Sequence, residues 1–303
     1  MSRLSSFIRR TRRDAAERWF LCDGLMRATS GVASEARKIP VVVSLTTTAE
    51  RLPKTVFAVE CLLRQTVKPD RLVLWLDQKL EPLIPAWLQW QTRRGLEIRL
   101  IHDVGPHTKI FYALKEFVGT RIVTADDDVW YPNFWLEELL TAHERAPDCI
   151  TCHRAHRMTV DENGRFLPYK QWDWLAPSEV GPSLWLFPTG VSGVLYPPNA
   201  LHPEVGNAQV FQQLCPTADD VWLKAMSLLN HTPCQKVAPR SRDWPVVRGS
   251  QQKNLSMSNV ERGWNDVQLH AVFNHYKLHS CVQQFGDISD RLRPLGRQPW
   301  SAV

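Results

Sequence analysis

The feature that most constrains the fold of this 303-residue chain is a regular alternation of strand and helix patterns over residues 40–125. Four strands are predicted, at residues 40–45, 71–76, 96–101 and 121–125, and the first is a continuous apolar run typical of a buried parallel strand. Helical patterns separate them, with an apolar face over 56–63 and further helices at 85–94 and 109–117. Such alternation predicts an α/β fold, an open and mostly parallel sheet with helices on both faces.

Beyond residue 150 the pattern changes, because proline and tryptophan become frequent and strand signals become short. Strands are predicted at 149–153 and 193–196, and helices at 218–229 and 260–275. We therefore predict a separate N-terminal segment over 1–38, a first half over 39–150 and a second half over 151–303. The two halves are expected to form one compact domain, with the second built onto the sheet of the first.

The N-terminal segment carries most of the net charge. Residues 1–38 hold nine Lys and Arg against four acids, a balance of +5 in a chain whose formal charge is +6. Apolar residues between Leu4 and Met26 recur at helical spacing, which predicts a basic amphipathic helix. Such a helix can lie on an anionic membrane surface, and packing on the protein's own body is the alternative. Because the rest of the chain is nearly neutral, we expect no nucleic-acid partner.

No stretch approaches the roughly 20 apolar residues that a membrane span needs. The first eight residues also lack the apolar core of a signal peptide. We therefore expect a cytoplasmic protein, with residues 1–38 offering a peripheral contact to the inner face of the membrane.

Three consecutive carboxylates, Asp126, Asp127 and Asp128, follow the fourth predicted strand directly. Ligands of open α/β sheets bind at the carboxyl ends of the strands, so this is where a site is expected. Adjacent carboxylates repel one another unless a cation is near, and Mg²⁺ is commonly held by one or two carboxylates plus substrate phosphates. A surface turn rich in Asp is the alternative.

Two stretches resemble a known family. Residues 124–132 are similar to the Asp-x-Asp signature of GT-A glycosyltransferases, and Gln65 to Pro69 is similar to the segment before their second strand. Family 2 and related bacterial polysaccharide glycosyltransferases carry both in this order and spacing, and the resemblance covers about residues 40–230. It implies the GT-A fold, a nucleotide-diphosphate-sugar donor (UDP-sugar favoured) and Mn²⁺ or Mg²⁺.

The resemblance also implies roles for single residues. Asp128, with Asp126, would bind the metal, and Asp126 and Asp127 would contact the donor. Thr46 and Asp77, at the ends of the first two strands, match positions that touch the nucleoside. Many members have a Pro-Thr-Tyr-Asn run at residues 45–48, where this chain has Leu-Thr-Thr-Thr, so the base stays open.

Further candidates lie outside the triplet. Lys109 begins a predicted helix, where it can reach a diphosphate, and an exposed surface lysine is the alternative. Gly193 belongs to a loop that resembles the one passing close to the donor sugar, and an ordinary turn is the alternative. Four tryptophans, at 172, 174, 185 and 222, are of a type that stacks on sugar rings, although packing explains each as well.

Asp219 and Asp220 resemble the pair at which inverting GT-A enzymes place their catalytic base. One carboxylate would accept the proton of the acceptor hydroxyl as that oxygen attacks the anomeric carbon, and Asp220 is favoured. The alternative is an N-cap, with Thr217 or Asp219 starting the helix that follows.

These features predict a metal-dependent, hexosyltransferase-type glycosyltransferase of surface-polysaccharide synthesis, with inverting chemistry favoured. Residues 39–150 would bind the nucleotide sugar and residues 151–303 the glycan or lipid-linked glycan acceptor. A sugar nucleotidyltransferase is the nearest alternative, although residues 46–50 lack the Gly-rich phosphate loop usual in that class. A non-catalytic glycan-binding or scaffold protein on the same fold is the other.

Overall fold

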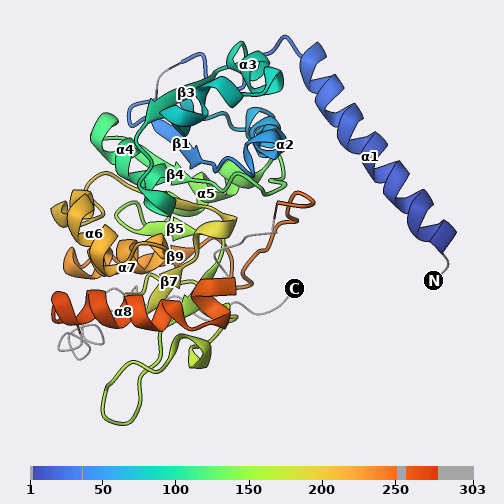
Figure 1. The fold of residues 1–303 in the computed structure, drawn as a ribbon. Coiled ribbons are helices and arrows are strands. Elements are labelled where there is room, and N and C mark those ends of the chain that lie inside the picture. Colours follow the sequence, from blue (N-terminus) through green and yellow to red (C-terminus); the bar gives the residue numbers. More distant parts are fainter. Residues whose placement is uncertain (1–2, 36, 251–256, 279–303) are drawn as a thin grey trace, which may run out of the picture.

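The computed structural model describes residues 3–35, 37–250 and 257–278 and centres on one seven-stranded sheet (Figure 1). The strand order is β3-β2-β1-β4-β8-β5-β9. The strands are β1 (Val41–Thr46), β2 (Arg71–Asp77), β3 (Leu96–Ile101), β4 (Arg121–Thr124), β5 (Ile150–Cys152), β8 (Val194–Tyr196) and β9 (Cys234–Lys236). A separate antiparallel pair is formed by β6 (Ala155–Arg157) and β7 (Leu186–Pro188).

The sheet is mostly parallel. β1 pairs in parallel with β2 and β4, β2 pairs with β3, and β5 pairs with β9. Only β8 runs antiparallel to its neighbours, β4 and β5. The predicted α/β class and its Rossmann-like, mostly parallel sheet are confirmed, and strands from both halves of the chain belong to that one sheet.

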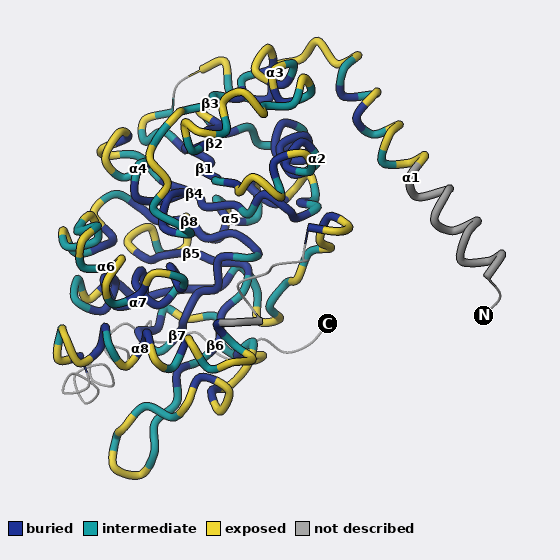
Figure 2. The backbone as a smooth tube through the Cα atoms, viewed as in Figure 1, coloured by how far each residue is buried: buried dark blue, intermediate teal, exposed yellow. Residues whose placement is uncertain are grey.

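Helices cover both faces of the sheet. The helices are α1 (Arg3–Met26), α2 (Leu52–Leu63), α3 (Ala86–Thr92), α4 (Thr108–Glu116), α5 (Trp135–His143), α6 (Ala208–Leu214), α7 (Asp219–Leu229) and α8 (Trp264–His275). Alternate residues of a strand point to opposite faces, so Val41 and Val43 pack with α2, α3 and α5, whereas Val42 packs with α4, α7 and α8. The central strands are buried on both faces (Figure 2), which is why they read as continuous apolar runs.

The last helix differs slightly from its prediction. A helix was expected from residue 260, but a π-helical turn (η7, Met257–Glu261) comes first and α8 begins at Trp264. Gly263 separates the two with a left-handed φ of 74°. A residue without a β-carbon adopts that conformation easily, so the chain changes direction there.

Helix α1 confirms the predicted N-terminal helix and stretches away from the body of the protein (Figure 1). Its C-terminal end is attached to α2, where Leu21 is buried in the core. The Arg64 guanidinium lies 4.0 Å from the Phe20 ring centroid, donates to the Phe20 carbonyl and contacts Asp23 at 3.0 Å. Within the described residues no helix is long and apolar enough to cross a membrane.

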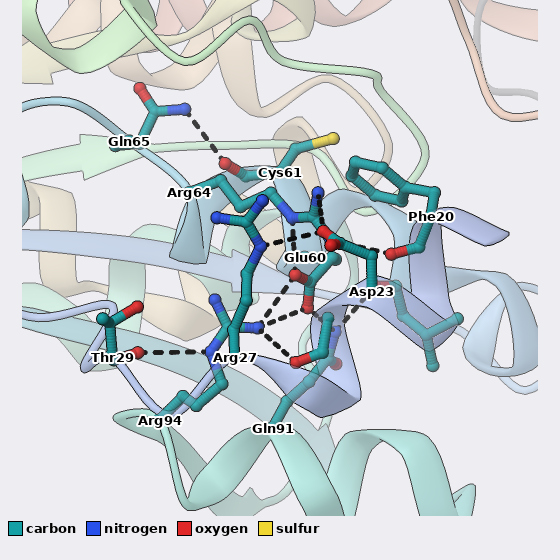
Figure 3. A network of polar contacts seen from close by, with 12 residues as sticks. Phe20, Asp23, Arg27, Thr29, Glu60, Cys61, Arg64, Gln65, Gln91 and Arg94 are labelled. Atoms are coloured by element: carbon teal, nitrogen blue, oxygen red, sulfur yellow. Dashed lines mark hydrogen bonds and ion pairs between the residues drawn. The ribbon is translucent and has the colours of Figure 1, made fainter.

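A buried carboxylate joins this attachment to the core (Figure 3). Glu60 of α2 accepts from Arg64 Nε at 2.6 Å and from Arg94 Nη1 at 2.8 and 2.9 Å. A β-carbon on Gly24 would lie 2.6 Å from the Glu60 carboxyl carbon, so only glycine lets α1 come this close. The end of α1 is therefore held by a buried ion-pair network.

Candidate functional site

A cavity of about 700 Å³ opens beside the carboxyl ends of β1 and β4. Both halves of the chain line it: the loop after β1, the start of α4 and the aspartate triplet on one side, the loop before β8 and the start of α7 on the other. Parallel strands of an open sheet end at a common edge, which is where such folds bind ligands. The cavity is therefore the candidate active site.

Two members of the triplet are paired with an arginine. Asp127 is buried, accepts from the Thr47 hydroxyl and lies 3.0 Å from Arg51 Nη1. Asp128 Oδ2 lies 3.4 Å from the same nitrogen. Burial raises the pKa of Asp127 to about 6, although the Arg51 charge and the Thr47 hydroxyl oppose the rise. Sequence reasoning missed Arg51, although this basic residue ends the loop that follows the first strand.

The third member, Asp126, is joined to the second acidic cluster by Lys109. The Lys109 Nζ lies 2.9 Å from Asp126 Oδ1 and 3.2 Å from Asp219 Oδ2. Burial alone would lower the pKa of Lys109, but Asp126 and Asp219 raise it well above its ordinary value. The exposed-lysine alternative is wrong, because this side chain is only 10% exposed and faces the cavity.

Asp219 and Asp220 lie in the first turn of α7 and line the cavity. The N-cap alternative is wrong, because Ala218 holds the cap position and the Thr217 hydroxyl donates to Asn259 instead. Asp220 Oδ1 accepts from the Gly190 N–H at 3.0 Å. Burial and the Asp219 charge raise the pKa of Asp220 to about 8, against the opposing charge of Lys109.

Asp219 Oδ2 is a buried acceptor that no described donor satisfies with hydrogen-bond geometry. Its contact with Lys109 at 3.2 Å is an ion pair whose alignment falls short of a hydrogen bond. Buried polar atoms are rarely left this way, and at a cavity wall such an atom is able to bind a ligand hydroxyl.

The two predicted nucleoside contacts are placed differently. Thr46 lines the cavity, although its hydroxyl donates to the Trp75 carbonyl oxygen at 3.0 Å. Asp77 does not line the cavity, because its carboxylate caps the 3₁₀ helix η1 (Gln78–Leu83) by accepting from the Lys79 N–H. Asp103, two residues beyond β3, lines the cavity instead. The strand-end rule that selected Asp77 also applies to Asp103.

The glycine that approaches the site is Gly190. Gly193 is absent from the cavity lining; it has a φ of 98°, and a β-carbon there would lie 2.5 Å from the Trp135 ring. Gly193 is therefore needed for packing. A β-carbon on Gly190 would lie 3.1 Å from Asp220 Oδ1 and 3.2 Å from the Lys109 Nζ. The glycine of this loop that lines the cavity therefore stands three residues before the predicted one.

The charge of the lining bears on the expected metal. Eight carboxylates and three cationic side chains line the cavity: Glu50, Asp103, Asp126, Asp127, Asp128, Asp219, Asp220 and Asp243 against Arg51, Lys109 and Arg154. A diphosphate entering such a field would be repelled, and a divalent cation would relieve the repulsion. Carboxylate oxygens are the donors that Mg²⁺ and Mn²⁺ prefer.

No three His, Cys, Asp or Glu side chains in the described part of the chain are arranged to hold a metal by themselves. A Mg²⁺-type site needs fewer protein ligands, because one or two carboxylates share the ion with phosphates and water. Asp126 and Asp128, two positions apart on the cavity wall, fit that requirement.

Three solved structures are similar to this chain at low sequence identity. No family model and no curated protein matches the sequence. A solved structure of S. aureus TarS residues 1–349 is 13% identical with a TM-score of 0.43, and the match covers 68% of this chain and 59% of that one. The mannosyltransferase PcManGT from Pyrobaculum calidifontis, solved with GDP-Man and Mn²⁺, is 13% identical with a TM-score of 0.46 and coverages of 93% and 83%.

The inositol-1-phosphate CTP transferase from T. maritima is 11% identical with a TM-score of 0.40, and the match covers 79% of this chain and 98% of that one. Glycosyl transfer and nucleotidyl transfer are thus both represented among structures similar to this chain. At such low identity and TM-score, the function of this chain has to be argued from its own cavity.

Proposed function

We propose that this protein is a metal-dependent glycosyltransferase that moves a sugar from a nucleotide-diphosphate sugar, with UDP-sugar favoured, to a glycan or lipid-linked glycan acceptor. The observation that carries the proposal is the meeting of two acidic clusters in one cavity, the triplet 126–128 and the pair 219–220, with Lys109 between them. Glycosyl transfer needs a place for a metal diphosphate and a base for the acceptor, and the two clusters offer one each.

The donor side belongs to the first half of the chain. Asp126 and Asp128 would hold Mn²⁺ or Mg²⁺, which when bound neutralises charge on the leaving diphosphate. Lys109 lies in the first turn of α4, where the helix N-terminus adds positive potential. It would bind a phosphate oxygen in place of one of its two aspartate partners. Arg51 is the second cation that the donor would meet on this wall.

The acceptor side belongs to the second half. The acceptor hydroxyl oxygen attacks the anomeric carbon, the bond from that carbon to the diphosphate oxygen breaks, and a carboxylate takes the hydroxyl proton. Asp220 is the proposed base. Burial and the Asp219 charge raise its pKa, and a carboxylate with a higher pKa is a stronger proton acceptor once it is ionised. Asp219, with its unsatisfied oxygen, would orient the same hydroxyl. Direct displacement by one base gives inversion.

Thermal-shift measurements test the donor site directly. UDP-, GDP-, CMP- and dTDP-sugars are added with and without Mn²⁺ to wild type, to Asp128→Ala and to the control Asp148→Ala, a change at an exposed residue away from the cavity. Saturation at a hundred times Kd stabilises the folded state by about 2.7 kcal/mol. We expect a metal-dependent shift for one nucleotide family that D148A keeps and D128A loses. An equal shift in D128A would contradict the metal assignment.

One observation favours the alternative of nucleotidyl transfer. Arg51 ends the loop after β1, the position at which a nucleotidyltransferase would use a basic residue against a triphosphate. In this structure Arg51 is instead paired with Asp127 and Asp128. We therefore expect no pyrophosphate release from nucleoside triphosphates mixed with sugar phosphates. Release at a rate above that of nucleotide-sugar turnover would reverse the choice.

Contact with an anionic membrane through residues 1–38 is proposed on the basis of α1. In its described C-terminal turns Trp19 is 68% exposed and Met26 87% exposed, while Leu21 is buried against the body. Exposed aromatic and aliphatic groups on a basic helix favour a lipid interface. We expect co-sedimentation with vesicles containing phosphatidylserine and none with neutral vesicles; equal binding to both would contradict an electrostatic contact.

A further inference from the structure

The structure separates the four tryptophans that the sequence offers for sugar stacking. Trp172 and Trp222 are buried in the core at 3% and 1% exposure, and Trp185 does not line the cavity. Trp174 does line it and is 39% exposed. An aromatic ring with a free face on a cavity wall is suited to stack on the apolar face of a sugar.

The Trp174 ring packs against two neighbouring rings. It packs on the His156 ring, with centroids 4.4 Å apart, and meets Tyr169 edge to face at 5.8 Å. Tyr169 and the proposed base Asp220 line the same cavity as Trp174, so the exposed ring shares its cavity with the proposed reaction centre.

The backbone after Trp174 is strained. Leu175 has a φ of 65° and Ala176 a φ of 37°, and neither residue is glycine. Consecutive left-handed residues with β-carbons are uncommon and persist only where the surroundings enforce them. Such strain gathers at sites where a side chain must be presented in one direction.

A buried ammonium enforces this turn. The Lys236 side chain, on a residue with 0% exposure, donates to the carbonyl oxygens of Leu175 and Ala176 at 2.9 and 2.6 Å. The Leu175 N–H donates to His156 Nδ1 at 3.0 Å, so the residue that supports the ring also fixes the turn. Burying an ammonium is costly, and burial lowers the pKa of Lys236 accordingly. The arrangement orients one tryptophan.

Polar groups stand on the same wall. Arg154 Nη1 donates to the Thr189 hydroxyl at 2.7 Å, and its Nε lies 2.9 Å from Asp243 Oδ1. The Asp243 side chain is 61% exposed, and both residues line the cavity. A planar donor and a carboxylate beside an aromatic ring are complementary to the hydroxyl groups of a sugar.

We propose that Trp174 is the platform on which the acceptor sugar stacks, with Arg154 and Asp243 binding its hydroxyl groups. The inference rests on the proposed glycosyl transfer and names its acceptor subsite: a hydroxyl-rich pyranose unit that presents an apolar ring face. Trp174 touches the acceptor, whereas Lys236 acts through the turn and is a positioning residue.

The test compares Trp174→Ala with wild type and with Trp90→Ala, a matched change at a partly exposed tryptophan of α3 outside the cavity. Donor hydrolysis is measured without acceptor, and transfer is measured to the methyl glycosides of glucose, galactose, mannose and N-acetylglucosamine. We expect W174A to raise the acceptor KM by about tenfold or more and to leave donor hydrolysis unchanged. An unchanged acceptor KM would overturn the assignment, because the ring would then not contact the acceptor. A fall in donor hydrolysis as large as the fall in transfer would also overturn it, because the ring would then contact the donor.

Leu175→Gly separates an effect on the orientation of the Trp174 ring from an effect on the stability of the fold. Glycine relieves the strain at φ 65°, so we expect an unchanged or higher melting temperature together with a raised acceptor KM. A lower melting temperature with an unchanged KM would overturn the role of the turn. If wild type hydrolyses no nucleotide sugar, the proposed function fails. Saturation-transfer NMR with the same glycosides then still tests the platform, and an absence of W174-dependent binding overturns it.

Discussion

Replacing Lys109 with Met removes the only cation that contacts both acidic clusters among the described residues. The three side chains concerned are well enclosed, with 10% exposure for Lys109, 11% for Asp219 and 25% for Asp126. Removing one partner of a buried ion pair costs about 3–5 kcal/mol. Because a quarter of the Asp126 side chain is exposed, we expect K109M to lower the free energy of unfolding by an amount near the lower end of that range, about 3 kcal/mol at pH 8.

The sign of the pH dependence follows from the charges that remain. Lys109 lowers the pKa of Asp220 against burial and the Asp219 charge, so without Lys109 that pKa in the folded protein rises further above its value in the unfolded chain. Groups of this kind contribute stability below their unfolded pKa values and lose it as pH rises through the folded ones. The deficit of K109M relative to wild type is therefore expected to be smaller at pH 5 than at pH 8.

Urea denaturation at both pH values measures this difference. Lys79→Met is the matched control, because that side chain is exposed and outside the cavity. Adding Mn²⁺ should return part of the K109M loss at pH 8, since a divalent ion replaces the missing charge. A deficit of the same size at pH 5 and pH 8 would refute the idea that Lys109 acts by holding the carboxylates ionised together.

Three further outcomes are expected. Glu60→Ala leaves Arg94 buried without its partner and should lower the free energy of unfolding by about 3–5 kcal/mol, of which a second change, Arg94→Met, restores part; additive losses in urea titrations would contradict the coupling. Gly193→Ala places a β-carbon 2.5 Å from the Trp135 ring at a φ of 98°, so we expect it to lower the free energy of unfolding by more than about 1 kcal/mol. A smaller loss, measured by calorimetry, would show that the neighbouring side chains can move to accept the β-carbon. Transfer by wild type should rise between pH 6 and pH 8, because Asp220, with a pKa of about 8, must lose its proton to act as a base; Asp220→Asn should abolish transfer and keep donor binding, and a flat initial-rate profile would assign the base elsewhere.

The parallel half of the fold was predictable because its strands are four to seven residues long and three of them, β1, β2 and β4, are largely buried. The runs at 40–45, 71–76, 96–101 and 121–125 correspond to β1, β2, β3 and β4 with ends that differ by at most one residue. In the second half the strands are three residues long, too short for periodicity to be read, so β6, β7 and β9 went unpredicted.

The site shows the same division. Its carboxylates were predictable because they follow strands or open a helix, positions that one rule connects to ligand binding. Arg51 and Asp103 obey that rule and were within reach. Trp174 was one of four candidate tryptophans, but its meeting with Arg154 and Asp243 was not predictable, because three irregular segments converge there only in the folded chain. The choice between Gly190 and Gly193 depended on which one faces Trp135, a fact of packing.

The single sheet has a consequence for how substrates enter. β4, which leads into the aspartate triplet, is laddered to β8, which follows the Gly190 loop, through the pairs Ile122–Tyr196, Val123–Leu195 and Thr124–Val194. Opening the cavity by rigid-body rotation of one half about a hinge would break those backbone hydrogen bonds. The two halves are therefore not free to rotate apart about a hinge while that ladder is intact. Under the proposed transfer, substrate entry and product release would call for a motion of the connecting segments, among them the one that carries Trp174.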